Sequence, residues 1–457
     1  MIIDVSKDAI PRIRNVYLLY HILPGLLIRE DFRQAIKNTG IELEEAPYRK
    51  EIEKRLDLLA GKGAVFRNNG KSIYLNRLSP ACALCDKGEG ALTVDVTHNC
   101  NRNCYHCFGD TSKIPKGQIY DYPGAVDAFA EMSEVRSMAL SGGEPLLYKS
   151  HALNCLGYVD EQFPEAYKRL YTNGDFLDAD VLRELQEVHL DEIRFSIKHT
   201  DFDDWSTLRK KIALSGDFIP NVMVEMPVMP GTLAVMKDIL VQLDELEIFG
   251  INLCEFCYCM HHAKEYNERS YKAKFPPFKT LYLNRRQYPG IPVAGSDLES
   301  YDLLAFAGDR GLKIGVHYCS LENRLTSPIY EMNYGQADDP VGYFSQKDFF
   351  IKNAIVCGQE DILQVMKVFE RHGVKDCRIV DGPAKYIEFH VGGIALLKDL
   401  DIDIGIVSSV MESDASSPAL GREEHGASVK AREYGKRKRV VKIDLTHPGI
   451  FDFEKDV

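Results

Sequence analysis

Apolar runs that read as strands alternate with amphipathic stretches from residue 90 to about residue 330. In the stretches 179–188 and 236–246, for example, apolar residues recur at helical spacing. The predicted strands are 92–97, 137–140, 169–172, 192–197, 221–227, 250–255 and 312–316. Strand–helix alternation predicts a parallel sheet covered by helices. Six or seven units are too few for a closed eightfold barrel, so we expect an α/β fold with a partial (βα)6-type TIM barrel over residues 81–335.

The two ends of the chain carry other patterns. Residues 1–80 combine a helical stretch at 49–59 with two apolar runs around the turn residues 68–70, which predicts a small winged-helix-like unit. Residues 340–412 follow the order β-α-β-β-α-β, which predicts a ferredoxin-like α+β domain. Residues 413–457 are first rich in Ser, Ala, Gly and Glu and then basic at 436–439, so we expect a linker and a basic tail.

Composition limits the classes of function. The 457 residues carry a formal net charge of −12. Nucleic-acid binding needs a surplus of Lys and Arg, so we expect no nucleic-acid partner and interpret the winged-helix-like unit as a docking module. The longest apolar stretch, 16–28, is broken by His21, Pro24 and Gly25, and the first residues lack a signal-peptide pattern. We therefore expect a cytoplasmic protein without a membrane span.

Twelve cysteines are the most informative part of the composition. Without a secretory signal, close cysteine spacing favours metal or redox chemistry over disulfides. The segment CNRNCYHCF follows the first predicted barrel strand and contains Cys100, Cys104 and Cys107. Four thiolates close a four-iron cubane, so three leave one iron with an open position. Zinc with His98 or His106 as fourth ligand is the alternative, but zinc sites usually pair two C-x2-C units, so the spacing favours iron and sulfur.

Three further segments at strand ends carry candidate ligand contacts. SGGEP spans 141–145 after the second strand, TNG spans 172–174 at the end of the third, and SIKH spans 196–199 at the end of the fourth. The carboxyl ends of parallel strands meet at one edge of the sheet, where barrel enzymes keep their chemistry. Glycines allow close backbone approach, and a carboxylate such as Glu144 suits an ammonium group.

With the cysteine loop, these segments resemble the radical S-adenosylmethionine (SAM) superfamily over residues 90 to about 320, and distantly its pyruvate formate-lyase activating enzyme-like members. The resemblance implies an enzyme of anaerobic metabolism in which a [4Fe-4S] cluster on Cys100, Cys104 and Cys107 reductively cleaves SAM. The products would be methionine and a 5′-deoxyadenosyl radical, which abstracts a substrate hydrogen. An electron donor such as flavodoxin or ferredoxin is implied as a partner. The implied SAM contacts are His106, Gly142, Gly143, Glu144, Thr172, Asn173, Ser196 and Lys198.

The remaining cysteines near the barrel rim point to a second metal site. Its occupant would be an additional [4Fe-4S] cluster or zinc, and unligated buried thiols are the alternative. The candidate ligands are Cys82, Cys85, Cys254, Cys257 and Cys259. Cys319 follows the last predicted strand and is a candidate catalytic residue, as a hydrogen-atom donor or a thiyl radical.

Several functions fit these features. The docking-type unit and the candidate second cluster favour a peptide, protein or cofactor precursor as substrate. SIKH, with Lys198 on the carboxylate of SAM, favours a glycyl-radical enzyme activase, although such activases are usually shorter. A methyltransferase-like enzyme that uses a second cofactor molecule is a third option, and we recognise no cobalamin-binding domain. A non-catalytic iron–sulfur redox sensor is the alternative of another class, but it would not need the SGGEP segment.

Overall fold

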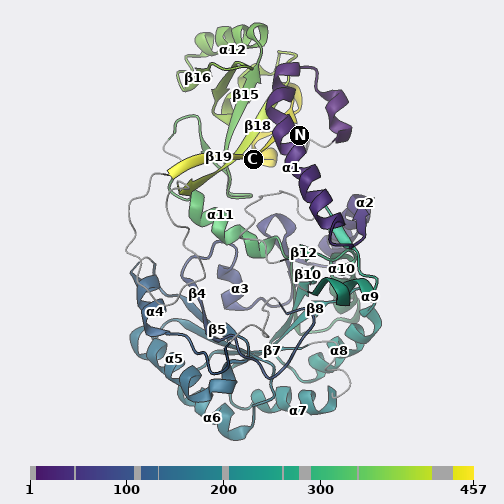
Figure 1. The fold of residues 1–457 in the computed structure, drawn as a ribbon, viewed down its shortest axis with the longest axis vertical. Helices are drawn as coiled ribbons and strands as arrows, with labels where there is room; N and C mark the ends of the chain where they lie inside the picture. Colours follow the sequence, from purple (N-terminus) through teal and green to yellow (C-terminus); the bar gives the residue numbers. More distant parts are fainter. Residues whose placement is uncertain are drawn as a thin grey trace.

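The computed structural model describes residues 7–45, 48–107, 115–131, 133–197, 205–259, 262–276, 290–336, 339–413 and 436–457. A large α/β part occupies one end of the molecule and a smaller α+β part the other, with α11 (Thr326–Asn333) between them (Figure 1). Helix α1 (Val16–Lys37) runs from the smaller part toward the larger one. Among the helices formed by these residues, none combines the length and apolar character that crossing a bilayer requires.

A nine-stranded sheet forms the core of the larger part. Seven neighbouring strands are parallel, which confirms the predicted parallel sheet. They are β4 (Ala91–Thr97), β5 (Ser137–Gly142), β6 (Tyr167–Thr172), β7 (Glu192–Ser196), β8 (Asn221–Val228), β9 (Gly250–Glu255) and β13 (Gly315–Cys319). The outer helices are α4 (Pro123–Ala130), α5 (Lys149–Gln162), α6 (Ala179–Glu187), α7 (Trp205–Ser215), α8 (Leu233–Glu245) and α10 (Ser296–Arg310) (Figure 1).

The last parallel strand begins later than predicted. Residues 312–314 were expected in the strand, but β13 starts at Gly315. Gly311 ends α10 in the left-handed conformation, and Leu312 donates its N–H back to the carbonyl of Ala307. The apolar residues before Gly315 therefore complete the turn after the helix.

Residues 1–80 do not form the separate winged-helix-like unit that the sequence predicted. β2 (Val65–Arg67) and β3 (Ser72–Leu75) form the expected hairpin, but β3 pairs with β13 and extends the barrel sheet. Helix α2 (Tyr48–Gly61) packs on α10, and α1 packs on the C-terminal sheet through Leu18 and Ile22. The reason is burial, because Ile73 and Leu75 of the hairpin belong to the barrel core.

The segment between β9 and α10 forms a layer beside the barrel opening. β10 (Cys257–Tyr258) pairs with β12 (Ile291–Pro292), and β11 (Ala273–Phe275) pairs with β1 (Leu43–Glu45) from the N-terminal region. Helix α9 (Ala263–Glu268) lies between β10 and β11 in the chain. Its buried Tyr266 stacks on Phe256, and Tyr105 of the cysteine loop packs against this apolar cluster.

In the smaller part, the elements between residues 351 and 413 have the expected order strand, helix, strand, strand, helix, strand, and the second helix is a 3-10 helix. The elements of this part are β14 (Tyr343–Phe344), β15 (Ile351–Cys357), α12 (Gln359–His372), β16 (Cys377–Val380), β17 (Tyr386–Phe389), a 3-10 helix (Val391–Leu397), β18 (Ile404–Ser413), β19 (Lys436–Thr446) and α13 (Phe453–Asp456). The sheet order is β16-β17-β15-β18-β19, with β14 beside β15.

The expected basic tail is a strand instead. β19 pairs with β18 along its whole length, and Arg439 Nε lies 2.9 Å from Glu412 Oε1 on that neighbour. Leu445 alternates inward and is fully buried. The basic residues thus have a partner strand that the local sequence does not reveal. Most of the expected linker, residues 414–435, lies outside the described residues.

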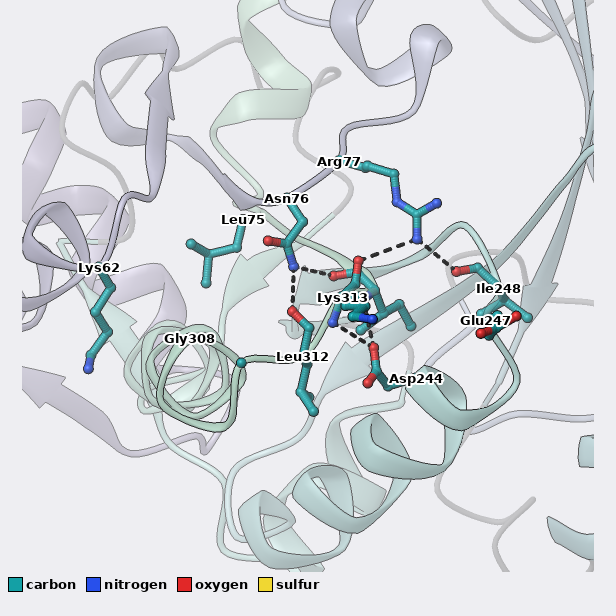
Figure 2. A pocket seen from close by; sticks show the side chains of 12 residues that line it. Lys62, Leu75, Asn76, Arg77, Asp244, Glu247, Ile248, Gly308, Leu312 and Lys313 are labelled. Atoms are coloured by element: carbon teal, nitrogen blue, oxygen red, sulfur yellow. Dashed lines mark hydrogen bonds between the residues drawn. The ribbon is translucent and has the colours of Figure 1, made fainter.

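A pocket opens at the amino-terminal ends of β9 and β13 (Figure 2). Two of its polar side chains, those of Asn76 and Asp244, bind the main chain. Asn76 Nδ2 donates to the carbonyls of Leu312 and Ile314, both at 2.8 Å. Asp244 Oδ1 accepts the N–H groups of Lys313 and Ile314, both at 2.7 Å. These bonds fix the turn into β13, so we assign the pocket a structural role.

Candidate functional site

The cysteine loop begins where β4 ends, at the carboxyl edge of the parallel sheet. Cys100, Cys104 and Cys107 are all partly exposed. The Arg102 N–H donates to Cys100 Sγ at 3.4 Å, and the Cys107 N–H donates to the carbonyl of Cys104 at 3.0 Å. The loop therefore presents three accessible thiols from one short, internally bonded segment.

The SGGEP segment is joined to this loop through its main chain. Gly143 N–H donates to the carbonyl of Thr97 at 2.7 Å, and Glu144 N–H donates to that of Asn99 at 2.9 Å. A Cβ at Gly142 would lie 2.1 Å from the Thr97 carbonyl oxygen, and one at Gly143 would lie 2.1 Å from that of Asn99. The paired glycines are thus required by the contact between SGGEP and the chain that leads into the cysteine loop.

Glu144 joins the ends of β5 and β6. Its side chain is fully buried. The carboxylate accepts hydrogen bonds from Leu146 N at 3.1 Å, Thr172 Oγ1 at 2.8 Å and Asn173 N at 2.7 Å. The structure therefore shows Glu144 as a link between SGGEP and TNG, and its contact with an ammonium group stays a prediction.

The TNG turn also binds the cysteine loop directly. Asn173 Nδ2 donates to Asn101 Oδ1 at 2.8 Å, and Arg102 Nε donates to Asp175 Oδ2 at 2.8 Å. The hydrogen bond from Arg102 lowers the pKa of the Asp175 carboxyl below its ordinary value. Sequence reasoning missed Asn101, Arg102 and Asp175. Their signal was their position, inside the cysteine motif and directly after TNG.

The other predicted SAM contacts are placed less completely. The centroid of the His106 ring lies 5.0 Å from that of Tyr105 and 6.0 Å from that of Phe256. The main-chain carbonyl of His106 accepts a hydrogen bond from Cys259 Sγ at 3.7 Å. Ser196 is the last residue of β7 and is partly exposed. Lys198 lies outside the described residues.

The remaining rim cysteines fall into two groups. Cys82, on α3 (Pro80–Leu84), lies 3.6 Å from both Nη atoms of Arg194. Burial acts to raise the pKa of the Cys82 thiol, but Arg194 and the neighbouring His317 lower it to about 6. Burial raises the pKa of Cys85 to about 12, and the nearby Cys319 and Cys82 thiols add to this effect. Cys257 and Cys259 are hydrogen-bonded to each other in the layer beside the barrel.

The donor set of the loop suits an iron–sulfur cluster better than a single metal ion. Within the described ranges, no three His, Cys, Asp or Glu side chains gather tightly enough to hold one metal ion. A cubane asks for a wider arrangement, because each thiolate binds a different iron. Three partly exposed thiols on one loop, with a main-chain N–H directed at Cys100 Sγ, fit that requirement.

Comparison with known proteins places this site in a family. Residues 94–224, from β4 into β8, match the model of the radical SAM superfamily. A protein of Methanocaldococcus jannaschii that carries the provisional name of a glycyl-radical enzyme activating enzyme is 28% identical over 202 residues, covering 42% of this chain and 54% of that protein. The S-adenosyl-L-methionine-dependent 2-deoxy-scyllo-inosamine dehydrogenase of Niallia circulans is 34% identical over 110 residues, covering 22% of this chain and 42% of the enzyme.

The chain thus spans about half the length of the curated relatives it matches. Among solved structures, Streptococcus suis SuiB bound to its precursor peptide SuiA covers 49% of this chain and 51% of its own, with 12% identity and a TM-score of 0.33. The family match covers the segment in which the cysteine loop, SGGEP and TNG meet, so residues 94–224 carry a radical SAM domain, and enzymes of that superfamily use a [4Fe-4S] cluster and SAM.

Proposed function

We propose that the chain is an enzyme that binds a [4Fe-4S] cluster through Cys100, Cys104 and Cys107 and cleaves SAM reductively. The 5′-deoxyadenosyl radical would then abstract a hydrogen from a peptide, a protein or a cofactor precursor. A cluster held by these three thiolates would supply the single electron that breaks the carbon–sulfur bond of SAM. The observation that carries the proposal is that hydrogen bonds join the cysteine loop to both SGGEP and TNG at one edge of the sheet.

The chain's own contribution is positioning. Asn173 donates a hydrogen bond to Asn101 of the cysteine loop, and Asp175 accepts one from Arg102 of that loop. Glu144 fixes the ends of β5 and β6 relative to each other. Preorganisation of this kind spares a bound cofactor the cost of ordering the protein around it. The proposed SAM contacts on these segments are His106, Gly142, Gly143, Glu144, Thr172 and Asn173. Ser196, at the end of β7, and Lys198 complete the proposed set.

Activation of a glycyl-radical enzyme is a second candidate function. It is supported by the 28% identity to the M. jannaschii relative that carries the provisional activase name. The substrate would then be the main chain of a glycine in a partner protein. A glycyl radical is detected by electron paramagnetic resonance, so incubation of a candidate partner with SAM and reductant tests this function. Flavodoxin or ferredoxin would supply electrons in either case.

The proposal is tested by SAM cleavage under anaerobic conditions. The protein is reconstituted with iron and sulfide, and 5′-deoxyadenosine and methionine are measured after addition of SAM and dithionite. We expect both products from the wild type and neither from the Cys100→Ala/Cys104→Ala/Cys107→Ala variant. Cys377→Ala is the matched control, because Cys377 is also partly exposed but lies in β16 of the smaller part. A fully reconstituted wild type that forms no 5′-deoxyadenosine contradicts the proposal.

A further inference from the structure

We infer that Cys82, Cys85, Cys254 and Cys319 bind a second iron–sulfur cluster on the inner face of the barrel sheet. The inference builds on the proposed function, because it places this cluster within the same barrel as the SAM site. It also changes the ligand set that the sequence suggested. Cys319 joins the set as a ligand rather than as a hydrogen donor, and Cys257 and Cys259 leave it.

Two of the four thiols come from neighbouring parallel strands. Cys319 of β13 and Cys254 of β9 are register partners, and so are His317 and Asn252 two residues earlier. Register partners in a sheet place their side chains on the same face, as do residues two apart along a strand. His317 Nε2 is 2.8 Å from Ser72 Oγ of β3, and Asn252 Nδ2 is 3.1 Å from Glu225 Oε2 of β8. One polar face therefore runs from β3 to β8 and ends in the two thiols.

The other two thiols come from the C-x2-C segment before β4, which is docked on this face. Both Nη atoms of Arg194, on β7, lie 3.6 Å from Cys82 Sγ. Ser79 Oγ donates to Glu192 Oε2 at 2.6 Å, and the Arg67 guanidinium donates to the carbonyls of Cys82 and Ala83. Cys85 ends the short helix that contains Cys82, and the Cys82 and Cys319 thiols both help to raise the pKa of its thiol. The C-x2-C segment and the end of β13 are therefore neighbours on this face.

The surroundings of these sulfurs differ from those of core cysteines. A buried unligated cysteine behaves as a small apolar residue and needs no polar partner. Here Cys82, Cys254 and Cys319 are only 8%, 6% and 6% exposed, yet each sulfur faces a nitrogen donor. The donors are Arg194 for Cys82, Asn252 at 3.6 Å for Cys254 and Asn323 at 3.5 Å for Cys319. Hydrogen bonds to sulfur are a means by which proteins stabilise and tune iron–sulfur clusters.

The same face contains a polar atom that needs an occupant. Asn252 is 4% exposed, and its Oδ1 has no hydrogen-bond partner among the described residues. Buried polar atoms without partners are rare in folded proteins, and they often mark an unplaced ligand or water. A single zinc ion fits less well, because no three ligand side chains of the described ranges gather around one position. Four thiols that each bind their own iron do not need to converge in this way.

Cys257 and Cys259 face other partners. Cys257 packs with Leu321, and the Cys259 thiol donates to the carbonyl of His106 at 3.7 Å. These two cysteines therefore belong to the layer that packs on the cysteine loop, and they provide a matched control for the four proposed ligands.

The experiment uses the full chain with the first cluster removed. The Cys100→Ala/Cys104→Ala/Cys107→Ala variant is reconstituted anaerobically with iron and sulfide, desalted, and analysed for iron, acid-labile sulfide and zinc. We expect iron and sulfide in equal amounts, about four of each per chain. Adding Cys82→Ser/Cys85→Ser or Cys254→Ser/Cys319→Ser should remove both elements, whereas adding Cys257→Ser/Cys259→Ser should leave them unchanged. Circular dichroism establishes that each variant is folded.

Three results overturn the inference. The first is that the folded triple variant binds no iron. The second is that iron and sulfide remain after the four proposed ligands are replaced, and the third is that the triple variant binds zinc without sulfide. If the triple variant does not fold, iron is compared between the wild type and Cys82→Ser/Cys85→Ser, for which we expect a clear loss of iron, and an unchanged iron content overturns the inference.

The outcome is separable from that of the proposed function. If the wild type cleaves SAM but the triple variant binds no iron, only the inference of a second cluster is contradicted. If the triple variant binds a cluster but the wild type forms no 5′-deoxyadenosine, only the proposed function is contradicted.

Discussion

Arg102 in the cysteine loop and Asp175 in the turn after β6 form a two-point ion pair. Arg102 Nε lies 2.8 Å from Asp175 Oδ2, and Arg102 Nη2 lies 2.5 Å from Asp175 Oδ1. In the sequence, Arg102 lies between Cys100 and Cys104, so its ion pair with Asp175 connects the loop of proposed cluster ligands to the TNG turn. A planar guanidinium that meets a carboxylate at two points fixes orientation as well as distance.

Replacing Arg102 by Ala should weaken the cluster site. The loop would lose its tie to Asp175, and residues that orient ligands typically contribute about 10- to 100-fold to metal affinity or activity. We expect a fall of this size in the rate of 5′-deoxyadenosine formation at equal protein concentration, together with a lower iron content. Arg183→Ala is the control, because Arg183 pairs with Asp180 on the exposed surface of α6. Equal rates for both variants would contradict this role.

Replacing Gly143 by Ala should displace the cysteine loop. The new Cβ would lie 2.1 Å from the carbonyl oxygen of Asn99, and main-chain atoms cannot move aside locally. Overpacking typically costs about 1–3 kcal/mol, so the free energy of unfolding should fall by that amount in urea titrations. Gly61→Ala meets no atom within 4 Å and should be nearly neutral. An unchanged stability for Gly143→Ala would show that the close approach is not required.

Replacing Glu144 by Gln distinguishes a structural from a purely ligand-binding role. The Glu144 carboxylate now accepts hydrogen bonds from Leu146 N, Thr172 Oγ1 and Asn173 N. Glutamine has one acceptor oxygen and two N–H donors, so at least one of these three groups would lose its acceptor. Leaving a buried donor unpaired costs about 1–3 kcal/mol. We expect this loss in the unfolding free energy without any SAM present, and none for the exposed Glu187→Gln. Wild-type stability in Glu144→Gln would place its role in ligand binding alone.

The smaller part should lose stability in acid through Asp348. Burial acts to raise the pKa of this carboxyl, but Lys352, with Nζ 2.9 Å from Oδ2, lowers it below its ordinary value. The ion pair therefore contributes fully to the free energy of unfolding above about pH 4, the ordinary pKa of Asp. This contribution is lost as the pH falls through the lowered pKa of Asp348. Unfolding measured from pH 7 downward should show a steeper decline for the wild type than for Asp348→Asn. Parallel profiles would contradict the assignment.

The sequence predicted those elements whose signal is local. Buried parallel strands are rich in apolar residues, and β5, β8 and β9 show this directly. β6 and β7 also contain charged residues, among them Lys168 and Arg194. The signal for the hairpin of β2 and β3 was also local. Its pairing with β13, however, joins residues far apart in the chain, so the sequence pattern did not show whether the hairpin belonged to a winged-helix-like unit or to the edge of the barrel sheet. β19 was hidden because its first residues are basic and its partner Glu412 lies in the preceding strand.

The same distinction holds for the site. The cysteine loop, SGGEP and TNG are recognisable as short motifs, and their positions at strand ends followed from the alternation. The bonds between the motifs did not follow. Glu144 was expected to face a ligand, yet it bonds Thr172, and Arg102 and Asp175 gave no motif of their own. Side-chain pairing across strands depends on the register, which only the folded chain provides.

The central claim, that the three-thiolate loop leaves an iron open for SAM, is tested most directly by electron–nuclear double resonance. The reduced, reconstituted protein is mixed with SAM labelled with ¹⁵N at the methionine amino group, and SAM binding is established by equilibrium dialysis. The account predicts a hyperfine coupling between the cluster spin and the labelled nitrogen that is absent from the Cys100→Ala/Cys104→Ala/Cys107→Ala variant. Bound SAM without such a coupling in the wild type would contradict it.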